Sequence, residues 1–177
     1  MSFLGMVTAI LLLANTPAQD GAPRIKLKVK GVDSARDRGS LEKSLRAHAS
    51  IDDVLAGKNG TVTILMKQGK KPLTLRLSDI SAAVAKAGGE MALDNAKSSL
   101  DGKFRVETAS DAKGMAKTLN GLKGVRSVGK GAIGKGTVSF EVTAKGLNLG
   151  ALMNAAGEAK IDLVWTAPAK KKSGGGG

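Results

Sequence analysis

An internal repeat constrains the fold of this 177-residue chain more than any other feature. The offset between equivalent residues falls from 77, between Val29 and Val106, to 69, between Gly88 and Gly157. Each copy begins with an alternating apolar–polar segment and continues with a helical pattern, a short motif with apolar residues at both ends, another alternating segment and a second helical pattern. It ends with an apolar segment. Period-two alternation is typical of half-buried strands, and apolar residues three and four apart share one helix face. The sequence therefore predicts an α+β fold of two β-α-β-β-α-β units in tandem, the ferredoxin-like arrangement.

The two copies correspond segment by segment. The predicted strands are 25–30, 51–54, 61–64 and 90–93 in the first copy and 103–107, 125–128, 137–140 and 161–165 in the second. The apolar face of the first helix is formed by Leu41, Leu45 and His48 in the first copy and by Met115, Leu119 and Leu122 in the second. The second helices are predicted at 79–87 and 149–156. Ser78 and Asn148 are the expected N-caps of the second helices, because their side chains can accept backbone N–H bonds. Gly88 and Gly157 are expected to end these helices.

The repeat also predicts the domain organisation. We expect one domain at residues 24–95 and a second at 101–167, joined by a linker at 95–102 that is short enough for the two units to touch. Residues 168–177 form a Lys/Gly tail, which is expected to be disordered because it has almost no apolar surface to bury.

The first residues resemble a targeting segment. Residues 3–14 are an apolar run that is too short to span a bilayer, which takes about 20 residues. Its length, with the small residues Thr16 and Ala18 after it, predicts a signal peptide at 1–18 that is cleaved after Ala18. An uncleaved apolar anchor is the alternative. We therefore expect a periplasmic or secreted protein without a transmembrane span, and the absence of cysteine fits an oxidising compartment.

The composition excludes several function classes. Without cysteine there is no thiolate metal site and no cysteine nucleophile, and His48 is the only histidine, so we predict that the chain is not an enzyme. Its four aromatic residues do not suit base stacking on single-stranded nucleic acid. The net charge of +13 favours an anionic partner or surface. Non-specific nucleic-acid binding by charge alone stays open as an alternative.

The order and motifs of the units resemble the heavy-metal-associated (HMA) domain family. The first unit carries the resemblance at Lys28–Val32, at Leu41, Glu42, Lys43 and Leu45, at Ile51 and Val54, and at Ala87–Gly88. The resemblance covers residues 24–95 and, more weakly, 101–167. It implies a ferredoxin-like fold and a metal-binding loop of the form G-M-x-C-x-x-C after the first strand. The family includes copper chaperones, mercury-binding proteins and the N-terminal modules of metal-pumping ATPases.

This chain departs from the family at that loop, where Ser34 and Asp37 occupy the two cysteine positions. Hydroxyl and carboxylate oxygens are hard ligands that do not replace thiolates for Cu(I) or Hg(II). No metal ligand is therefore carried over, no cofactor is expected, and a bound metal ion is implied by the resemblance alone. A metal carrier that uses Met, His or carboxylate ligands is the alternative function.

Other candidate residues favour structural roles. A hard-cation site at Asp33, Asp37, Asp52 and Asp53 is disfavoured by Arg36 and Arg38; His48 is expected to be a partly buried, hydrogen-bonded side chain, and Met66, Met91, Met115 and Met153 are expected in the core. The run 129–136 contains G-x-G-x-x-G, but an alternating segment follows it where a phosphate-binding loop requires a helix. It is interpreted as a hairpin, like Asn59-Gly60 in the first unit.

The basic residues of the first strand are the candidate binding surface. Lys26, Lys28 and Lys30 share one face of a strand whose other face is apolar, and Arg105 occupies the matching strand of the second unit. Thr61, Thr63 and Leu65 are the expected neighbours of the lysines. We predict a binding or structural module whose basic sheet faces dock an acidic protein or envelope surface; a merely solvated face is the alternative. The sequence does not predict the partner or the oligomeric state.

Overall fold

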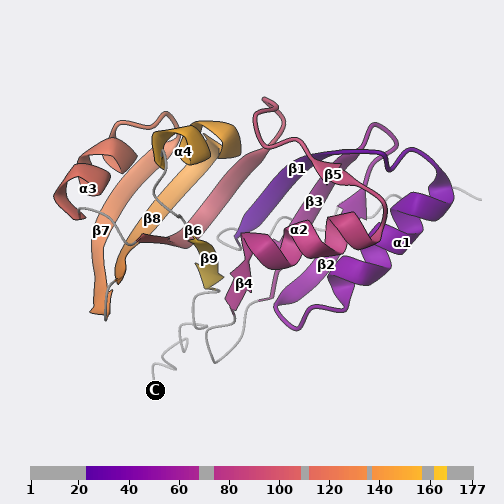
Figure 1. The fold of residues 1–177 in the computed structure, drawn as a ribbon, viewed down its shortest axis with the longest axis horizontal. Coiled ribbons are helices and arrows are strands. Elements are labelled where there is room, and N and C mark those ends of the chain that lie inside the picture. Colours follow the sequence, from indigo (N-terminus) through magenta and orange to yellow (C-terminus); the bar gives the residue numbers. More distant parts are fainter. Residues whose placement is uncertain (1–22, 68–73, 109–111, 135–136, 157–161, 167–177) are drawn as a thin grey trace, which may run out of the picture.

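A computed structural model of the chain describes residues 23–67, 74–108, 112–134, 137–156 and 162–166. In these residues the chain forms nine strands and four helices (Figure 1). In order they are β1 (Arg24–Lys30), α1 (Ala35–Arg46), β2 (Ile51–Ala56), β3 (Thr61–Met66), β4 (Thr74–Arg76), α2 (Leu77–Lys86), β5 (Glu90–Met91), β6 (Ser99–Thr108), α3 (Ala112–Asn120), β7 (Val125–Gly134), β8 (Thr137–Asn148), α4 (Leu149–Ala156) and β9 (Asp162–Thr166). The predicted signal peptide at 1–18 and tail at 168–177 lie outside the described residues.

Each half of the molecule has the strand order of a ferredoxin-like unit. The first half reads β2-β3-β1-β5 and the second reads β7-β8-β6-β9, with antiparallel neighbours throughout. This order confirms the predicted α+β class with two βαββαβ units in tandem. The short β4, which pairs with β9, is an addition to both repeats. Three residues are too few to show an alternating pattern, so the sequence does not predict this strand.

The two halves share one sheet. β1 pairs with β6 in an antiparallel register that places Ile25 opposite Leu100 and Lys26 opposite Ser99. The central order is therefore β2-β3-β1-β6-β8-β7. The expected linker at 95–102 thus contains the first residues of β6, because these residues find a partner strand in the other half. The expected contact between the units is consequently a pairing of strands.

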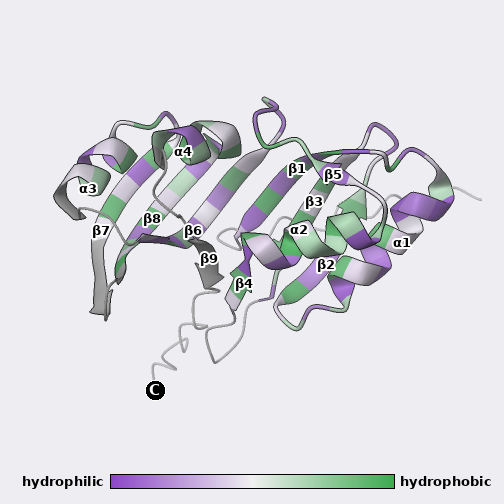
Figure 2. Ribbon diagram, in the orientation of Figure 1, coloured by the Kyte–Doolittle hydropathy of each residue, from purple (hydrophilic) through white to green (hydrophobic). Residues whose placement is uncertain are grey.

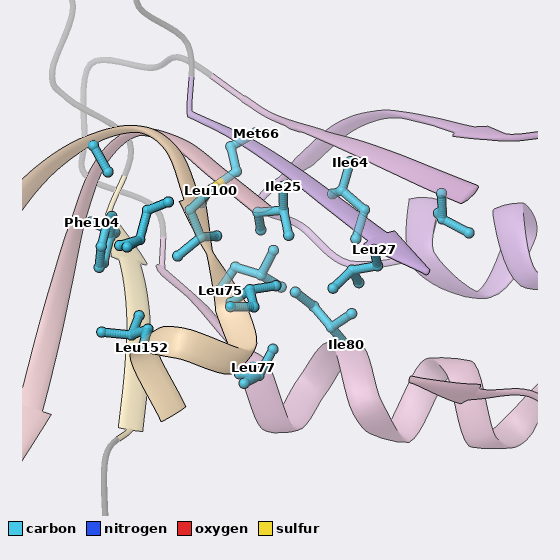
Figure 3. Packing of buried hydrophobic residues seen from close by; sticks show 14 of the residues in the cluster. Ile25, Leu27, Ile64, Met66, Leu75, Leu77, Ile80, Leu100, Phe104 and Leu152 are labelled. Atoms are coloured by element: carbon cyan, nitrogen blue, oxygen red, sulfur yellow. The ribbon is translucent and has the colours of Figure 1, made fainter. Parts of the chain in front are cut away.

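One hydrophobic core also runs through both halves. The buried cluster includes Ile25 and Leu27 from β1 together with Leu100, Phe104 and Leu152 from the second half. Figure 3 shows Leu100 beside Ile25, and it draws Leu75 and Leu77 of the first half and Leu152 of α4 as members of the same cluster. A contiguous buried cluster of this kind is the usual mark of a single cooperative core. The division at residues 24–95 and 101–167 therefore describes the repeat, and as a boundary between independent domains it stays a prediction.

A buried serine fastens the junction of the two halves. The Ser98 side chain is 0% exposed; its Oγ accepts the backbone N–H of Lys28 at 3.0 Å and donates to the carbonyl of Ala92 at 2.7 Å. The Ser98 carbonyl accepts the N–H of Leu149, the first residue of α4, at 2.9 Å. One residue thus links β1, the segment before β6, and the start of α4, where buried backbone groups would otherwise lack partners.

All described helices lie on one side of the sheet (Figure 1). In β1 and β3 every second residue is buried, and the residues between are partly exposed (Figure 2). The sheet therefore has a helical face, which holds the core, and an opposite face that no described element covers. We call this second surface the open face.

Most of the predicted helix caps and turns are confirmed. α4 begins and ends at the predicted residues, and Asn148 caps it by accepting the N–H of Ala151 at 2.9 Å. The Asn59-Gly60 hairpin is present, with Gly60 at φ +67° and its N–H bonded to the Gly57 carbonyl at 3.0 Å. A Cβ at Gly60 would lie 2.4 Å from the Val29 carbonyl oxygen, so a side chain there is excluded.

The predicted start of the second helix was wrong. α2 begins at Leu77, so Ser78 lies inside the helix and Arg76 is the N-cap. The carboxylate of Asp79 accepts the backbone N–H of Arg76 at 3.0 Å, which satisfies one free donor of the first turn. The β4–β9 pairing fixes the chain just before this point, and such a long-range contact is invisible in local sequence.

Replacing Ser98 should destabilise the whole fold. We expect Ser98→Ala to lower the free energy of unfolding by about 1–3 kcal/mol, because it leaves the buried N–H of Lys28 and the carbonyl of Ala92 without a partner. Urea unfolding followed by circular dichroism measures this change. Ser99→Ala is the matched control, since the neighbouring serine is only partly buried, and its effect should stay within about 0.5 kcal/mol. Equal effects of the two substitutions would contradict the role of Ser98.

Candidate functional site

The lysines predicted as a binding surface lie on the open face. Lys26 and Lys28 are partly exposed, Lys30 is exposed, and Ile25, Leu27 and Val29 between them point into the core. In the register of β1 with β3, Lys26 stands opposite Thr63, Lys28 opposite Thr61 and Arg24 opposite Leu65. The structure therefore gathers Arg24, Lys26, Lys28 and Lys30, which we call the basic column. The neutral neighbours that were predicted stand opposite the first three of these residues.

Two members of the basic column have specific contacts. The Lys28 ammonium donates to the carbonyl of Asn59 in the β2–β3 hairpin. Arg24 stands opposite Asp101 of β6 in the sheet register. Lys30 stands opposite the exposed Glu90 of β5. The positive charge with no carboxylate directly opposite it is thus centred on Lys26 and Lys28. Positive potential on a surface without nearby anions attracts acidic ligands, with a strength that falls as salt is added.

Arg105 does not join the basic column. It lies on β6, where the β1–β6 register places it beyond the start of β1, away from Lys28 and Lys30. Its guanidinium is 3.6 Å from the carboxylate of Glu107, and Glu141 stands opposite it on β8. Its charge is therefore locally balanced, which the sequence could not show because Glu141 is 36 residues away.

The loop at the family's cysteine positions serves to start α1. Ser34 is the N-cap; its Oγ accepts the N–H of Asp37 at 3.0 Å and donates to the Asp37 carboxylate at 2.5 Å. Arg38 donates to the carbonyl of Asp33. The two side chains at the positions where the resemblance implies cysteines are thus hydrogen-bonded to each other and to the helix end. This arrangement satisfies the first turn of α1 and offers no pair of soft ligands.

The remaining acidic candidates lie apart from that loop. Asp53 pairs with Arg46 of α1 at 3.0 Å, and Asp52 is exposed on β2. The hydrogen bond that Arg46 donates to Asp53 raises the pKa of Arg46 above its ordinary value. In the described residues no three His, Asp or Glu side chains come close enough together to hold a metal ion.

His48 lies at a small cavity between α1 and α2. The cavity has a volume of about 220 Å³ and is lined mainly by apolar side chains, among them Leu45, Ile51 and Ile80. His48 is 33% exposed; its Nδ1 accepts the N–H of Ser50 at 3.2 Å, and its Nε2 is 3.6 Å from the carboxylate of Asp79. Partial burial with hydrogen bonding confirms the prediction for this residue. The sequence missed Asp79 as its partner, because the pairing depends on how α2 packs on α1.

This histidine is poorly placed to activate a nucleophile. Ser44 also lines the cavity, so a Ser-His-Asp arrangement has to be considered. In such a triad one imidazole nitrogen faces the carboxylate and the other accepts the serine proton. Here the second nitrogen, Nδ1, already accepts the backbone N–H of Ser50. The geometry therefore supports a structural bridge between α1 and α2.

The methionines and the glycine-rich run have structural positions. Met66 and Met115 are buried, and Met91 and Met153 pack against the core from different elements, as predicted. The run 129–136 comprises the end of β7 and the two residues before β8, with which β7 pairs as an antiparallel hairpin. A strand follows it where a phosphate-binding loop needs a helix, which confirms the hairpin interpretation. Its first glycines belong to β7 itself, however, and only residues 135–136 separate the two strands.

Comparison with known proteins identifies no family. No family model matches the chain, and no curated protein matches it. Two solved structures of the soluble region of the P-type ATPase CopA from Bacillus subtilis are similar, at TM-scores of 0.35 and 0.34 and identities of 20% and 18%. Both cover 79% of this chain, and 89% and 90% of those chains are covered. The fold assignment rests on the strand order described above. No helix in the described part of the chain is long and apolar enough to cross a bilayer.

Removing the N-cap of α1 should cost stability. We expect Ser34→Ala to lower the free energy of unfolding by about 1 kcal/mol, because the N–H of Asp37 loses its acceptor. Ser40→Ala, at an exposed position inside the same helix, is the control and should be neutral or slightly stabilising. Urea unfolding of both variants measures the difference. No cost at position 34 would show that this residue is not needed as a cap.

Proposed function

We propose that this chain is a non-enzymatic, exported binding module that docks an acidic protein or envelope surface through its open face. The supporting observation is the basic column on β1, in which Lys26 and Lys28 stand opposite neutral residues of β3 and the exposed Lys30 extends the row. The column lies near the middle of the shared sheet, on the side that no described helix covers. A flat row of cations with no adjacent aromatic platform suits a carboxylate-rich partner better than nucleic-acid bases.

We further propose that the chain is a tandem HMA-like protein that has lost the thiolate site. The motifs around helices α1 and α2 support this origin, and the hydrogen-bonded pair Ser34–Asp37 at the cysteine positions supports the loss. A loop whose polar side chains are committed to a helix cap retains the fold without the ligands. The alternative, a metal carrier with Met, His or carboxylate ligands, would need residues that lie in separate elements of the described structure.

Reversing charge on the basic column should abolish most of the binding. We expect Lys26→Glu with Lys30→Glu to weaken binding to poly-glutamate about tenfold or more, since two attractive contacts become repulsive. Fluorescence anisotropy with labelled poly-glutamate at low and physiological salt measures the affinity. Native protein should bind more weakly as salt rises.

A matched variant tests whether position or net charge matters. Lys43→Glu with Lys86→Glu makes the same change of charge on α1 and α2, away from the open face. This variant should keep affinity within about threefold of native, which is under 1 kcal/mol. Equal losses in both variants would reduce the proposal to non-specific charge attraction. Tighter binding to random DNA than to poly-glutamate would favour the nucleic-acid alternative.

The lost metal site predicts weak or absent binding of soft metals. Titration of purified protein with Cu(I), Zn(II) and Hg(II) under native mass spectrometry should show no stoichiometric complex at micromolar concentration, because soft cations require thiolate or thioether ligands. A stoichiometric complex of micromolar affinity or tighter would overturn the proposal in favour of a metal carrier.

Export predicts a defined mature end. If the signal peptide at 1–18 is removed, N-terminal sequencing of protein from its native source should begin at Gln19. A mature chain that begins at Met1 would contradict cleavage after Ala18, and recovery of the chain from the cytosolic fraction would contradict export.

A further inference from the structure

The two outer edge strands of the shared sheet differ in how their backbone groups are covered. β2 forms one end and β7 the other. An edge strand exposes unpaired backbone N–H and C=O groups, which proteins usually cover or protect because they can pair with another chain. Whether side chains cover the backbone groups of an edge strand therefore indicates whether a strand of another chain can pair with it.

Side chains of α1 close the β2 edge. Arg46 donates from Nη2 to the carbonyl of Val54 at 2.6 Å, and Glu42 accepts the backbone N–H of Ala56 at 2.9 Å. Arg46 also pairs with Asp53 at 3.0 Å and with Glu42 at 3.1 Å. Backbone groups that another strand would need are thus already satisfied. The exposed Leu55, 56% accessible, lies on this blocked strand.

The β7 edge has no such cover in the described part of the chain. β7 is ten residues long, pairs with β8 on one side, and has no described strand on the other. Arg126, Ser127 and Gly129 are exposed. In Figure 1 the strand forms the outer margin of the sheet beyond β8, with α3 above one end.

Gly129 has no structural need to be glycine. It is not among the glycines with positive φ, and a Cβ there would come no closer than 3.7 Å to any atom, the carbonyl oxygen of Glu141. By contrast, a Cβ at Gly124 would lie 2.8 Å from the backbone nitrogen of Leu147. Glycine inside a strand weakens it and often marks a place where another backbone approaches closely. At Gly129 the folded chain supplies no such neighbour.

The sequence of this edge carries a long run without acidic residues. From Ala112 to Phe140, which includes α3, β7 and the start of β8, there are six basic residues and no acidic one. Glu141, which follows the run, stands opposite Gly129 on the β8 side of the strand. The basic residues are Lys113, Lys117, Lys123, Arg126, Lys130 and Lys135. The β2 end instead carries Asp52 and Asp53. A partner strand at β7 would therefore be attracted by acidic side chains and repelled by basic ones.

We propose that β7 is a docking edge that binds an acidic segment of a partner protein as an additional β-strand. Backbone hydrogen bonds along Arg126–Gly134 supply the affinity, and the surrounding basic residues select for glutamate and aspartate. This site is separate from the open face and does not rest on its proposed function. A second copy of the chain is a poor occupant, because pairing β7 with β7 joins like charges and the β2 edge is closed by Glu42 and Arg46.

The test uses the full chain and a labelled ten-residue peptide of alternating threonine and glutamate. A second peptide has the same sequence but is N-methylated at every residue, which keeps its charge and removes all backbone donors. We expect the methylated peptide to bind at least about tenfold more weakly in fluorescence anisotropy. We also expect the first peptide to slow amide hydrogen exchange in residues 126–134 by at least about tenfold.

Two variants locate the effect. Arg126→Glu with Lys130→Glu should weaken binding of the first peptide about tenfold or more. Lys43→Glu with Lys86→Glu, an equal change of charge on α1 and α2, should leave it nearly unchanged. If the edge variant does not fold, the comparison of the two peptides on native protein still decides the matter.

Several results would overturn the proposal. Equal binding of the two peptides would show that binding depends on charge and not on backbone hydrogen bonds. Slower amide hydrogen exchange in β1 in place of β7 would show that the peptide binds the open face. If duplex DNA bound more tightly than the peptide and displaced it, the ligand of the β7 edge would be a phosphate backbone and not an acidic peptide. Concentration-dependent dimerisation that protects residues 126–134 would make a second copy the occupant.

Discussion

The pairing of β1 with β6 determines which sheet face and which sheet edges the molecule exposes. These strands begin the two copies of the repeat, and their antiparallel register fuses two four-stranded sheets into one. Ser98 fastens this junction from a fully buried position by hydrogen bonds to Lys28, Ala92 and Leu149. Leu100 then completes a core that runs through both halves. Because the strands pair edge to edge, the helices of both units stay on one side and a single open face remains.

The positions of charge follow from this junction. Fusion places β1 near the middle of the sheet, so that its basic column faces solvent on a broad surface and not at an exposed edge. It also leaves the sheet with two outer edges, of which α1 closes one through Glu42 and Arg46. The other, β7, carries glycine and basic residues. The basic column and the outer edge at α3 and β7 are therefore two separate regions in which part of the positive charge is concentrated.

Local patterns were sufficient to predict every described element except β4, and they were insufficient to predict the long-range contacts. Alternation located β1, β3 and β8, and Asn148 marked the start of α4, because both signals act within a few residues. The β1–β6 pairing, β4 and the closing of β2 by α1 depend on residues far apart in sequence, for which a single sequence has no signal. The same distinction between local and long-range signals applies to the predicted binding residues. The lysines of β1 were located by their own alternation, whereas the balancing of Arg105 by Glu107 and Glu141 depends on the sheet register.

The loop after β1 has a structural role that its own hydrogen bonds explain. Ser34 and Asp37 cap α1 at the positions where the HMA family has cysteines, so the helix retains its start. The surface that we propose for ligand binding is the open face. The most direct measurement is an amide chemical-shift map of the ¹⁵N-labelled chain during titration with poly-glutamate at low salt. The largest changes are predicted at Lys26–Lys30 and at the neighbouring Thr61–Leu65. Changes confined to residues 31–38 or to the cavity at His48, or no change in β1, would contradict a binding function of the open face.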